Sequence, residues 1–206
     1  MNFDRMFKPK SVAVIGVSSK NQQHPANVVY KKAKLRYQVS AYAINPKGGT
    51  LNGEPLYTSL DDISEEVDLV VIAARAEFVP ELFEACIRNN AGGAVLVSGG
   101  FAEVGNDELQ EKIVEIAKAA DFPFIGPNCI GTYVPNIIDT MFTPIERMER
   151  VEAGKVAIVS QSGGLMVDLM QKFSAFNVGI SKAISIGNKA LVRETELLEY
   201  LGKDPD

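Results

Sequence analysis

The sequence predicts an α/β protein in which a doubly wound parallel sheet is followed by the start of a second α/β domain. Two observations support this fold class. Short apolar, β-branched runs recur along the chain, and each ends at a polar or glycine-rich turn. Runs that are apolar on successive positions are typical of strands covered on both faces. The segments between them have helical spacing, and strand–helix alternation with right-handed crossovers produces a doubly wound sheet.

The five strands expected in the first sheet lie at residues 11–16, 39–44, 68–73, 93–98 and 122–126. The clearest helix between them carries apolar residues at three- and four-residue spacing, namely Leu109, Ile113, Ile116, Ala117 and Ala120. The region between the second and third strands is less regular, because it contains several glycines and an acidic turn at residues 61–62.

The strand–helix pattern stops after residue 131 and restarts at residue 155. The intervening segment contains Pro135, Pro144 and the charged stretch 146–150 without clear periodicity, which is typical of a connection. We therefore expect a first domain at 1–133, a connection at 134–153 and an incomplete second domain at 154–206. Strands are expected there at 155–160 and 180–186, and helices at 164–176 and 194–201. Two strands cannot form an independent sheet core, so this domain is either cut short or completed by packing on something else.

The composition is that of a globular protein. The 206 residues are 46% hydrophobic and 23% charged, and the net charge of -5 disfavours a nucleic-acid or anionic-membrane surface. Cys86 and Cys129 do not have metal-ligand spacing, and reduced cytosolic thiols are the simplest interpretation. The sequence has neither a membrane-length apolar run nor the apolar core of a signal peptide. We therefore expect a cytoplasmic protein without a metal site.

The loops that leave the strands indicate the ligand, because a doubly wound sheet binds ligands at the carboxyl ends of its strands. These loops are residues 16–20, 45–49, 98–103 and 126–131. They carry small residues, hydroxyls and two lysines, Lys20 and Lys47, which suit a phosphorylated ligand with a long body. Glycine and serine are also ordinary turn formers, which explains any one loop taken alone.

Two alternative sites are disfavoured by the residues themselves. An NAD site would carry G-x-G-x-x-G and an acidic residue after the second strand, whereas this chain has a lone Gly16 and then Asn45-Pro46-Lys47. The turn at residues 160–164, Ser-Gln-Ser-Gly-Gly, predicts a phosphate or carboxylate cradle at a helix N-terminus. A serine nucleophile there lacks G-x-S-x-G spacing, and the only histidine, His24, is far away in sequence.

Several runs, taken in order, resemble a known family. They are residues 7–19, 45–49, 98–103, 126–131, 159–163 and 185–190, with 197–201 and 204–206. Together they resemble the N-terminal part of NDP-forming acyl-CoA synthetases, including the ADP-forming acetyl-CoA synthetases. The α subunit of succinyl-CoA synthetase is similar but more distant. The resemblance covers essentially the whole chain. It implies a Rossmann-like CoA-binding domain followed by the start of a flavodoxin-like domain.

The resemblance also implies a reaction, in which acid, CoA and ATP form acyl-CoA, ADP and phosphate through a phosphohistidine. That histidine and the glutamate that pairs with it lie beyond the position of Asp206, so no catalytic residue is assigned and the chain alone is expected to be inactive. CoA and a small carboxylic acid or acyl-CoA are the implied ligands. ATP, ADP and Mg would be bound by an ATP-grasp domain or subunit as partner. A homo-oligomer is compatible with this picture.

The family motifs imply the following site residues. Gly16, Ser18, Ser19 and Lys20 would meet the phosphates of CoA, and Asn45, Pro46 and Lys47 its nucleotide end. Ser98, Gly99 and Phe101 would line the pantetheine path, with Asn128 and Cys129 near the thiol. Ser160, Gln161, Ser162 and Gly163 would form the cradle for phosphate or phosphohistidine.

Some residues depart from the family pattern or permit another function. The usual glycine before the first long helix is replaced around His24-Pro25-Ala26, and Pro25 removes one amide that could face phosphate. Arg75 is either a phosphate contact or a solvated charge, and Cys129 is alternatively a small packing residue. An alternative function is a CoA- or acyl-CoA-sensing regulatory region of a protein acetyltransferase.

Overall fold

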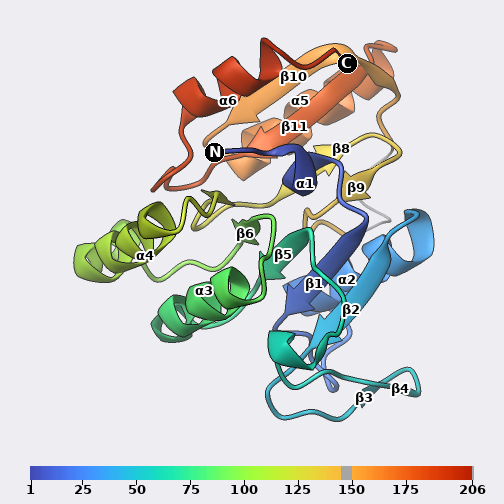
Figure 1. The fold of residues 1–206 in the computed structure, drawn as a ribbon. Coiled ribbons are helices and arrows are strands. Elements are labelled where there is room, and N and C mark those ends of the chain that lie inside the picture. The colour runs from blue at the N-terminus through green and yellow to red at the C-terminus, as the bar shows by residue number, and fades with distance from the viewer. Residues whose placement is uncertain (145–149, 206) are drawn as a thin grey trace.

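The computed structural model describes residues 1–144 and 150–205. A five-stranded parallel sheet with the order β2-β1-β5-β6-β7 forms the first half of the chain (Figure 1). Its strands are β1 (Ser11–Ile15), β2 (Ser40–Ile44), β5 (Leu69–Ile72), β6 (Ala94–Leu96) and β7 (Phe124–Ile125). The predicted fold class is confirmed, and each strand lies within the run that predicted it.

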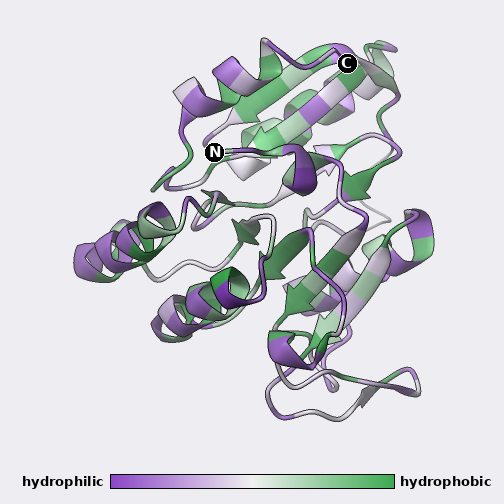
Figure 2. Cartoon of the chain, in the orientation of Figure 1, coloured by the Kyte–Doolittle hydropathy of each residue, from purple (hydrophilic) through white to green (hydrophobic). Residues whose placement is uncertain are grey.

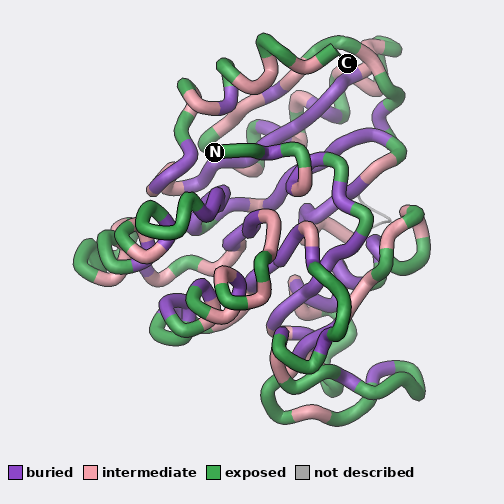
Figure 3. Tube along the Cα trace, viewed as in Figure 1, coloured by how far each residue is buried: buried purple, intermediate pink, exposed green. Residues whose placement is uncertain are grey.

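Helices cover both faces of this sheet, which explains why the strands are apolar on successive positions. Helix α2 (Pro25–Arg36) packs on one face, where Val12 and Val14 point. Helices α3 (Val79–Arg88) and α4 (Asp107–Ala119) pack on the other face, with Ala13 and Ile15 (Figure 1). The strands of both halves are mostly hydrophobic and buried (Figures 2 and 3).

The irregular region after β2 contains a small hairpin, β3 (Thr50–Leu51) and β4 (Glu54–Pro55). Its two turn residues, Asn52 and Gly53, have positive φ angles of 53° and 86°, as a tight type I′ hairpin turn requires. Short 3₁₀ turns follow later loops: η1 (Leu60–Asp62), η2 (Ala76–Phe78) and η3 (Ala102–Val104). The sequence around this hairpin has glycines at 48, 49 and 53 and no apolar alternation, so it does not predict the two strands.

The second half forms a four-stranded mixed sheet with the order β10-β11-β8-β9. Its strands are β10 (Ala153–Ser160), β11 (Ile180–Ser185), β8 (Thr132–Val134) and β9 (Ile138–Asp139). Helices α5 (Gly163–Ala175) and α6 (Glu194–Leu201) match their predicted ranges closely. The segment interpreted as a connection therefore contains β9 and one end of β8. Strand β8 pairs antiparallel with both β11 and β9. Residues 146–149 of its charged stretch lie outside the described residues, as does residue 145.

The two halves share one hydrophobic core. Val12 and Val71 of the first sheet belong to the same buried cluster as Ile184 and Leu197 of the second half. The short helix α1 (Asp4–Phe7) joins them as well, because the ring of Phe7 lies 5.4 Å from that of Tyr200 in α6. Among the described residues, no helix is long and apolar enough to cross a membrane.

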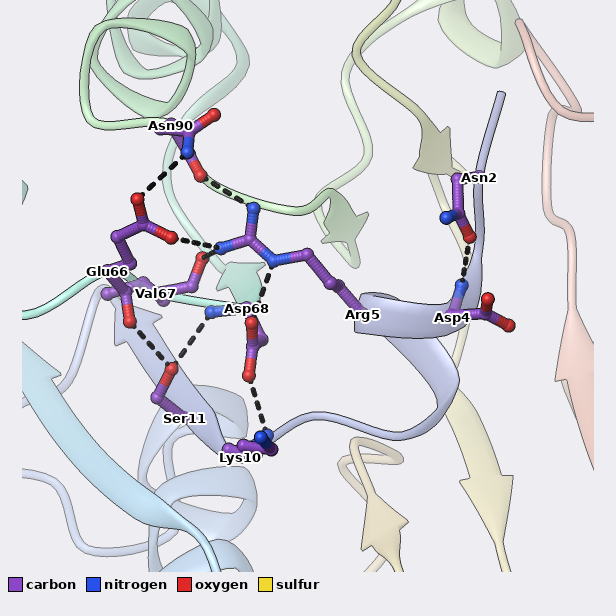
Figure 4. Close-up of polar contacts among 9 residues, drawn as sticks. All are labelled: Asn2, Asp4, Arg5, Lys10, Ser11, Glu66, Val67, Asp68 and Asn90. Atoms are coloured by element: carbon purple, nitrogen blue, oxygen red, sulfur yellow. Dashed lines mark hydrogen bonds and ion pairs between the residues drawn. The ribbon is translucent and has the colours of Figure 1, made fainter.

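A polar cluster fixes α1 at the amino ends of the strands (Figure 4). Arg5 Nε lies 2.7 Å from Asp68 Oδ1, and its two terminal nitrogens donate to the carbonyl oxygens of Asn90 and Val67. Ser11 Oγ accepts a hydrogen bond from the Asp68 amide. These bonds connect the N-terminal segment to the segments around Asp68 and Asn90. The cluster lies at the opposite end of the sheet from the loops that follow the strands. Its role is structural.

Candidate functional site

The candidate site lies at the carboxyl ends of β1, β2 and β5, where the strand order reverses between β1 and β5. The loop after β1 approaches the end of β5 very closely at Gly16. Its φ is +100°, and a Cβ added there would lie 2.2 Å from the carbonyl oxygen of Ala73. Only glycine fits this position, so the first loop is held flat against the neighbouring strand end.

Side-chain amides fix the first two loops relative to each other. Asn27 of α2 is buried, and its amide group bonds both the N–H (2.7 Å) and the carbonyl oxygen (2.8 Å) of Ser18. Asn45, after β2, donates to the carbonyl oxygen of Val17 at 2.7 Å. Ser18 Oγ accepts the amide of Lys20 at 3.2 Å, which shapes the turn toward α2. The two loops therefore form one preorganised surface.

The charged and hydroxyl groups of these loops face solvent. Ser19, Lys20 and Lys47 are exposed, as is Pro46. A Cβ on Gly49 would lie 3.7 Å from Ser19 Cβ, so the two loops are in contact where these groups emerge. Two lysines at the edge of one crevice attract an anionic ligand, and a phosphate there would be stabilised by them.

A largely apolar pocket of about 260 Å³ opens beside these loops. Its walls come from the ends of β1 and β2, the segment before η1, and α3 with the loop preceding it: Ile15, Gly16, Ile44, Asn45, Pro46, Thr58, Ser59, Leu60, Ala74, Phe78, Leu82 and Ala85. Phe78 is 44% exposed, so part of its ring is open to solvent at this pocket. The contribution of α3 to this pocket was not predicted, because its apolar residues are equally typical of a helix face that packs on a core.

Arg75 stands over Phe78 at this pocket. Its guanidinium carbon lies 4.9 Å from the centroid of the Phe78 ring, and NH1 lies 3.2 Å from Glu77 Oε1. Arg75 itself remains exposed. The Glu77 carboxylate therefore partly neutralises the charge of Arg75. Both interpretations of Arg75, a phosphate contact or a solvated charge, stay predictions.

The loops after β6 and β7 meet at the same edge of the sheet. The Asn128 amide donates to the carbonyl oxygen of Ser98 at 2.8 Å, and Gly99 and Asn128 are exposed. The ring of Phe101 and the thiol of Cys129 instead turn into the core, at 0% and 4% exposure. In this structure these two residues therefore present almost no surface to a ligand. The expected site residues remain a prediction.

Cys129 is a packing residue here. Its thiol donates to the carbonyl oxygen of Leu96 at 3.4 Å, and burial raises the pKa of the Cys129 thiol to about 12. A neutral buried thiol is a poor nucleophile. The structure therefore supports the packing interpretation of this side chain over one in which it reacts.

Glu103 and Asn188 were not singled out from the sequence, although both lie in runs that carried the family resemblance. The Glu103 carboxylate accepts the amides of Gly100 and Phe101 and the side-chain amide of Asn188. Burial acts to raise the pKa of Glu103, but the hydrogen bonds from Asn188 and the Gly100 amide outweigh it, so the pKa lies below its usual value. Asn188 also contacts Asn128, with Asn128 Nδ2 donating to Asn188 Oδ1 at 3.3 Å.

The turn after β10 forms a second polar surface at the start of α5. Ser162 caps the helix, because its Oγ accepts the Leu165 amide at 3.3 Å, and Ser160 Oγ donates to the Ser162 carbonyl oxygen. The first amides of a helix have no partner within it and carry partial positive charge, which favours an anion. A Cβ on Gly163 would lie 2.8 Å from Ile130 Cβ, so this turn packs directly on the loop after β7.

Among the described residues, the hydroxyls of Ser160 and Ser162 bond to backbone groups of the turn rather than to a base. His24 caps α2 instead, where its Nδ1 accepts the Ala26 amide at 3.3 Å. Within residues 1–144 and 150–205, no group of three or more His, Cys, Asp or Glu side chains could hold a metal ion. The chemistry that the described residues support is anion binding by lysines, hydroxyls and helix N-termini.

Comparisons with known proteins agree with this geometry. The sequence model of the family described as CoA binding domain matches residues 10–135, and that of the succinyl-CoA ligase like flavodoxin domain matches residues 153–206. Among curated proteins, an acetate–CoA ligase [ADP-forming] I of Archaeoglobus fulgidus is 38% identical over 98% of this chain and 29% of its own length. The subunit alpha of acetate–CoA ligase [ADP-forming] I of Pyrococcus furiosus is 34% identical over 99% of this chain and 45% of its own length.

A solved structure is similar over nearly the whole chain. It is the dinucleotide forming acetyl-coenzyme A synthetase 1 of Ca. Korarchaeum cryptofilum, in complex with phosphate and ADP. The TM-score is 0.89 at 32% identity, covering 99% of this chain and 43% of that one. The chain thus spans less than half the length of each of these relatives.

Proposed function

Because the chain belongs to the CoA-binding domain family, we propose that its crevice binds coenzyme A as part of an NDP-forming acyl-CoA synthetase. The observation that carries this proposal is the apolar pocket of about 260 Å³, lined in part by the loops that carry the exposed Lys20 and Lys47. A flat base beside several phosphates needs an apolar slot next to a cationic edge, and the chain offers both in one place.

The nucleotide end of CoA would occupy the pocket. Asn45 and Pro46 line it, and Lys47 stands at its rim for the ribose phosphate. The diphosphate would lie along residues 16–20, close to the N-terminus of α2, where helix amides favour an anion. Pro25 at the first helical position removes one such amide, so Lys20 and Ser19 would supply more of the binding.

The pantetheine arm would run from that loop toward residues 98–101 and end near Asn128. This path follows the carboxyl ends of neighbouring strands, in the order β1, β5, β6 and β7. The cradle at residues 160–163 lies beside it, because Gly163 packs on Ile130 in the loop after β7. Thiol and phosphate would therefore be held next to each other, as acyl transfer from an acyl phosphate to CoA requires.

The complete reaction would convert acid, CoA and ATP into acyl-CoA, ADP and phosphate. In this chain the residues bind and orient, whereas the phosphohistidine and the ATP-grasp part would be supplied from outside residues 1–206. The relative from Pyrococcus furiosus is named as a subunit alpha, which supports a partner subunit for this chain. We place the activity in the cytoplasm, where CoA and ATP are available.

Calorimetric titration with CoA tests the proposal. We expect saturable binding of CoA but not of NAD, and weaker binding by the Lys20→Ala and Lys47→Ala variants. Lys112→Ala, on α4 away from the crevice, is the matched control and should bind as the unchanged protein does. With ATP, acetate and CoA, the chain alone should form no acetyl-CoA. An absence of saturable heat at millimolar CoA would refute the binding.

A further inference from the structure

Three loops at the edge of the first sheet are joined by a short chain of side-chain hydrogen bonds. It runs from Glu103, in the turn η3 after β6, through Asn188, after β11, to Asn128, after β7. We propose that Glu103 and Asn188 are positioning residues, which orient the side-chain amide of Asn128 so that its carbonyl oxygen faces the crevice. The identity of the ligand that this oxygen meets rests on the proposed function.

Glu103 is the fixed end of this chain. Its carboxylate accepts the amides of Gly100 and Phe101, at 2.5 and 3.2 Å, and so holds the turn that follows β6. The Asn106 side chain closes the same turn by donating to the carbonyl oxygen of Gly100 at 3.0 Å. The lowered pKa of Glu103 means that it is a carboxylate at neutral pH. The carboxylate therefore stays charged and in place.

A carboxylate can only accept hydrogen bonds, and this decides the orientation of both asparagines. Asn188 must turn its NH₂ group toward Glu103, and the same group also donates to Gln110 Oε1 at 3.0 Å. The side-chain carbonyl oxygen of Asn188 then faces Asn128. Asn128 must therefore donate from its own NH₂ group, and Asn128 Nδ2 lies 3.3 Å from Asn188 Oδ1. The oxygen of Asn128 is left pointing away from Asn188.

The backbones that carry the two asparagines are pinned together, so the amides cannot adjust by moving apart. The backbone N–H of Asn188 donates to the carbonyl oxygen of Pro127 at 2.9 Å. Gly187 has a φ of +53°, and a Cβ there would lie 2.1 Å from the same oxygen. Asn128, also at positive φ, is held from the other side by its bond to Ser98. Side-chain orientation is the main freedom that remains, and Glu103 removes it.

The oxygen of Asn128 faces the exposed Gly99. A Cβ built on Gly99 would lie 3.7 Å from Asn128 Oδ1 and 2.8 Å from Glu103 Oε1, so the absence of a side chain leaves this acceptor open. An acceptor selects a ligand group that donates. On the proposed CoA path, the matching group is an amide N–H of the pantetheine arm. Asn128 would thus bind the pantetheine arm, whereas the pocket near Asn45 would bind the nucleotide end.

The Glu103→Gln variant tests the proposal, because glutamine can donate as well as accept and no longer dictates the orientation of Asn188. Titrations would compare CoA with adenosine 3′,5′-bisphosphate, which has the nucleotide end but no arm. We expect CoA to bind about three- to tenfold more weakly, the effect of one hydrogen bond, and the bisphosphate to stay within about twofold. Glu108→Gln, on the exposed surface of α4, is the matched control and should change neither.

Each outcome separates this proposal from general damage and from the proposed function. Unchanged CoA affinity in Glu103→Gln overturns the positioning role, and so does an equal loss for both ligands. If the unchanged protein bound neither ligand, the proposed function would fail on its own. The side-chain NH₂ resonances of Asn128 and Asn188 in the ligand-free protein then decide the remaining question. We expect both pairs to shift in Glu103→Gln but not in Glu108→Gln, and an unmoved Asn128 pair overturns the hydrogen-bond chain.

Discussion

Replacing Lys32 by methionine would break a buried ion pair that joins the two halves of the molecule. Lys32 Nζ, on α2, lies 2.7 Å from Asp139 Oδ2 on β9, and the two side chains are only 1% and 5% exposed. Lys32 also donates to the carbonyl oxygen of Met141. Burial lowers the pKa of Lys32 and raises that of Asp139 from their ordinary values, although each partner opposes the shift of the other. The pair therefore carries a large desolvation cost that its own attraction offsets only in part.

The expected loss of stability comes from the unpaired carboxylate of Asp139. Methionine fills most of the volume of lysine, so packing changes little, but Asp139 stays buried without its cation. Loss of one partner of a buried pair costs about 3–5 kcal/mol. With a urea dependence of about 2 kcal/mol per molar, the unfolding midpoint should fall by about 2 M. Lys31→Met, one residue away on the exposed face of α2, is the control and should change stability by less than about 0.5 kcal/mol.

Urea unfolding followed by circular dichroism measures both variants against the unchanged protein. A double variant, Lys32→Met with Asp139→Leu, removes the orphaned charge and should recover a large part of the loss. It also keeps the test informative if the single variant does not fold. A free energy of unfolding for Lys32→Met within about 1 kcal/mol of that for Lys31→Met would refute the reasoning, because it would mean that water or another cation reaches Asp139.

Two further predictions follow from local geometry. Gly16→Ala should destabilise the protein clearly more than Gly105→Ala, and it should weaken CoA binding. Both glycines have positive φ, so the backbone strain is similar. The new Cβ would collide with backbone atoms at Gly16, whereas nothing lies within 4 Å of a Cβ at Gly105. Equal losses in unfolding experiments would contradict the collision. The thiols of Cys86 and Cys129, whose pKa values burial raises to about 12, should resist a thiol-specific reagent in the folded protein and react in concentrated guanidinium. Rapid native-state labelling of either would contradict the burial.

The first sheet was predictable because its signal is local and repeated. Its strands are apolar on successive positions apart from Ser11 and Ser40, because helices cover both faces of the sheet, and each strand ends at a turn that lies in the expected place. The strands β8 and β9 were not predictable, because they are two or three residues long and depend on tertiary pairing. β8 pairs with β11, some fifty residues further along the chain, and β9 pairs with β8. The proline-containing sequence around them indicates a connection, and only the buried Tyr133, Val134 and Ile138 show why it becomes part of a sheet.

The candidate site divides in the same way. The loops with lysines and hydroxyls were predicted, because residues that directly follow a parallel strand must lie at one edge of the sheet. The residues that position those loops were missed. Asn27 lies within a helix and Asn188 in a loop of the other half of the chain, and the hydrogen bonds that give them a role depend on tertiary contacts. Cys129 is the opposite case, since its place in a loop motif does not reveal that its side chain turns inward.

The loop after β7 is the point at which the proposed CoA crevice and the proposed phosphate cradle depend on each other. Ile130 is in contact with the start of α5 at Gly163, and Pro127 is in contact with the end of β11 at Gly187. Both contacts are closer than any side chain at the glycine would allow. The two contacts hold this loop, and with it Asn128, against both turns of the second half. If the thiol of CoA lies at Asn128, as proposed, the reacting end of CoA and the cradle would share this one loop.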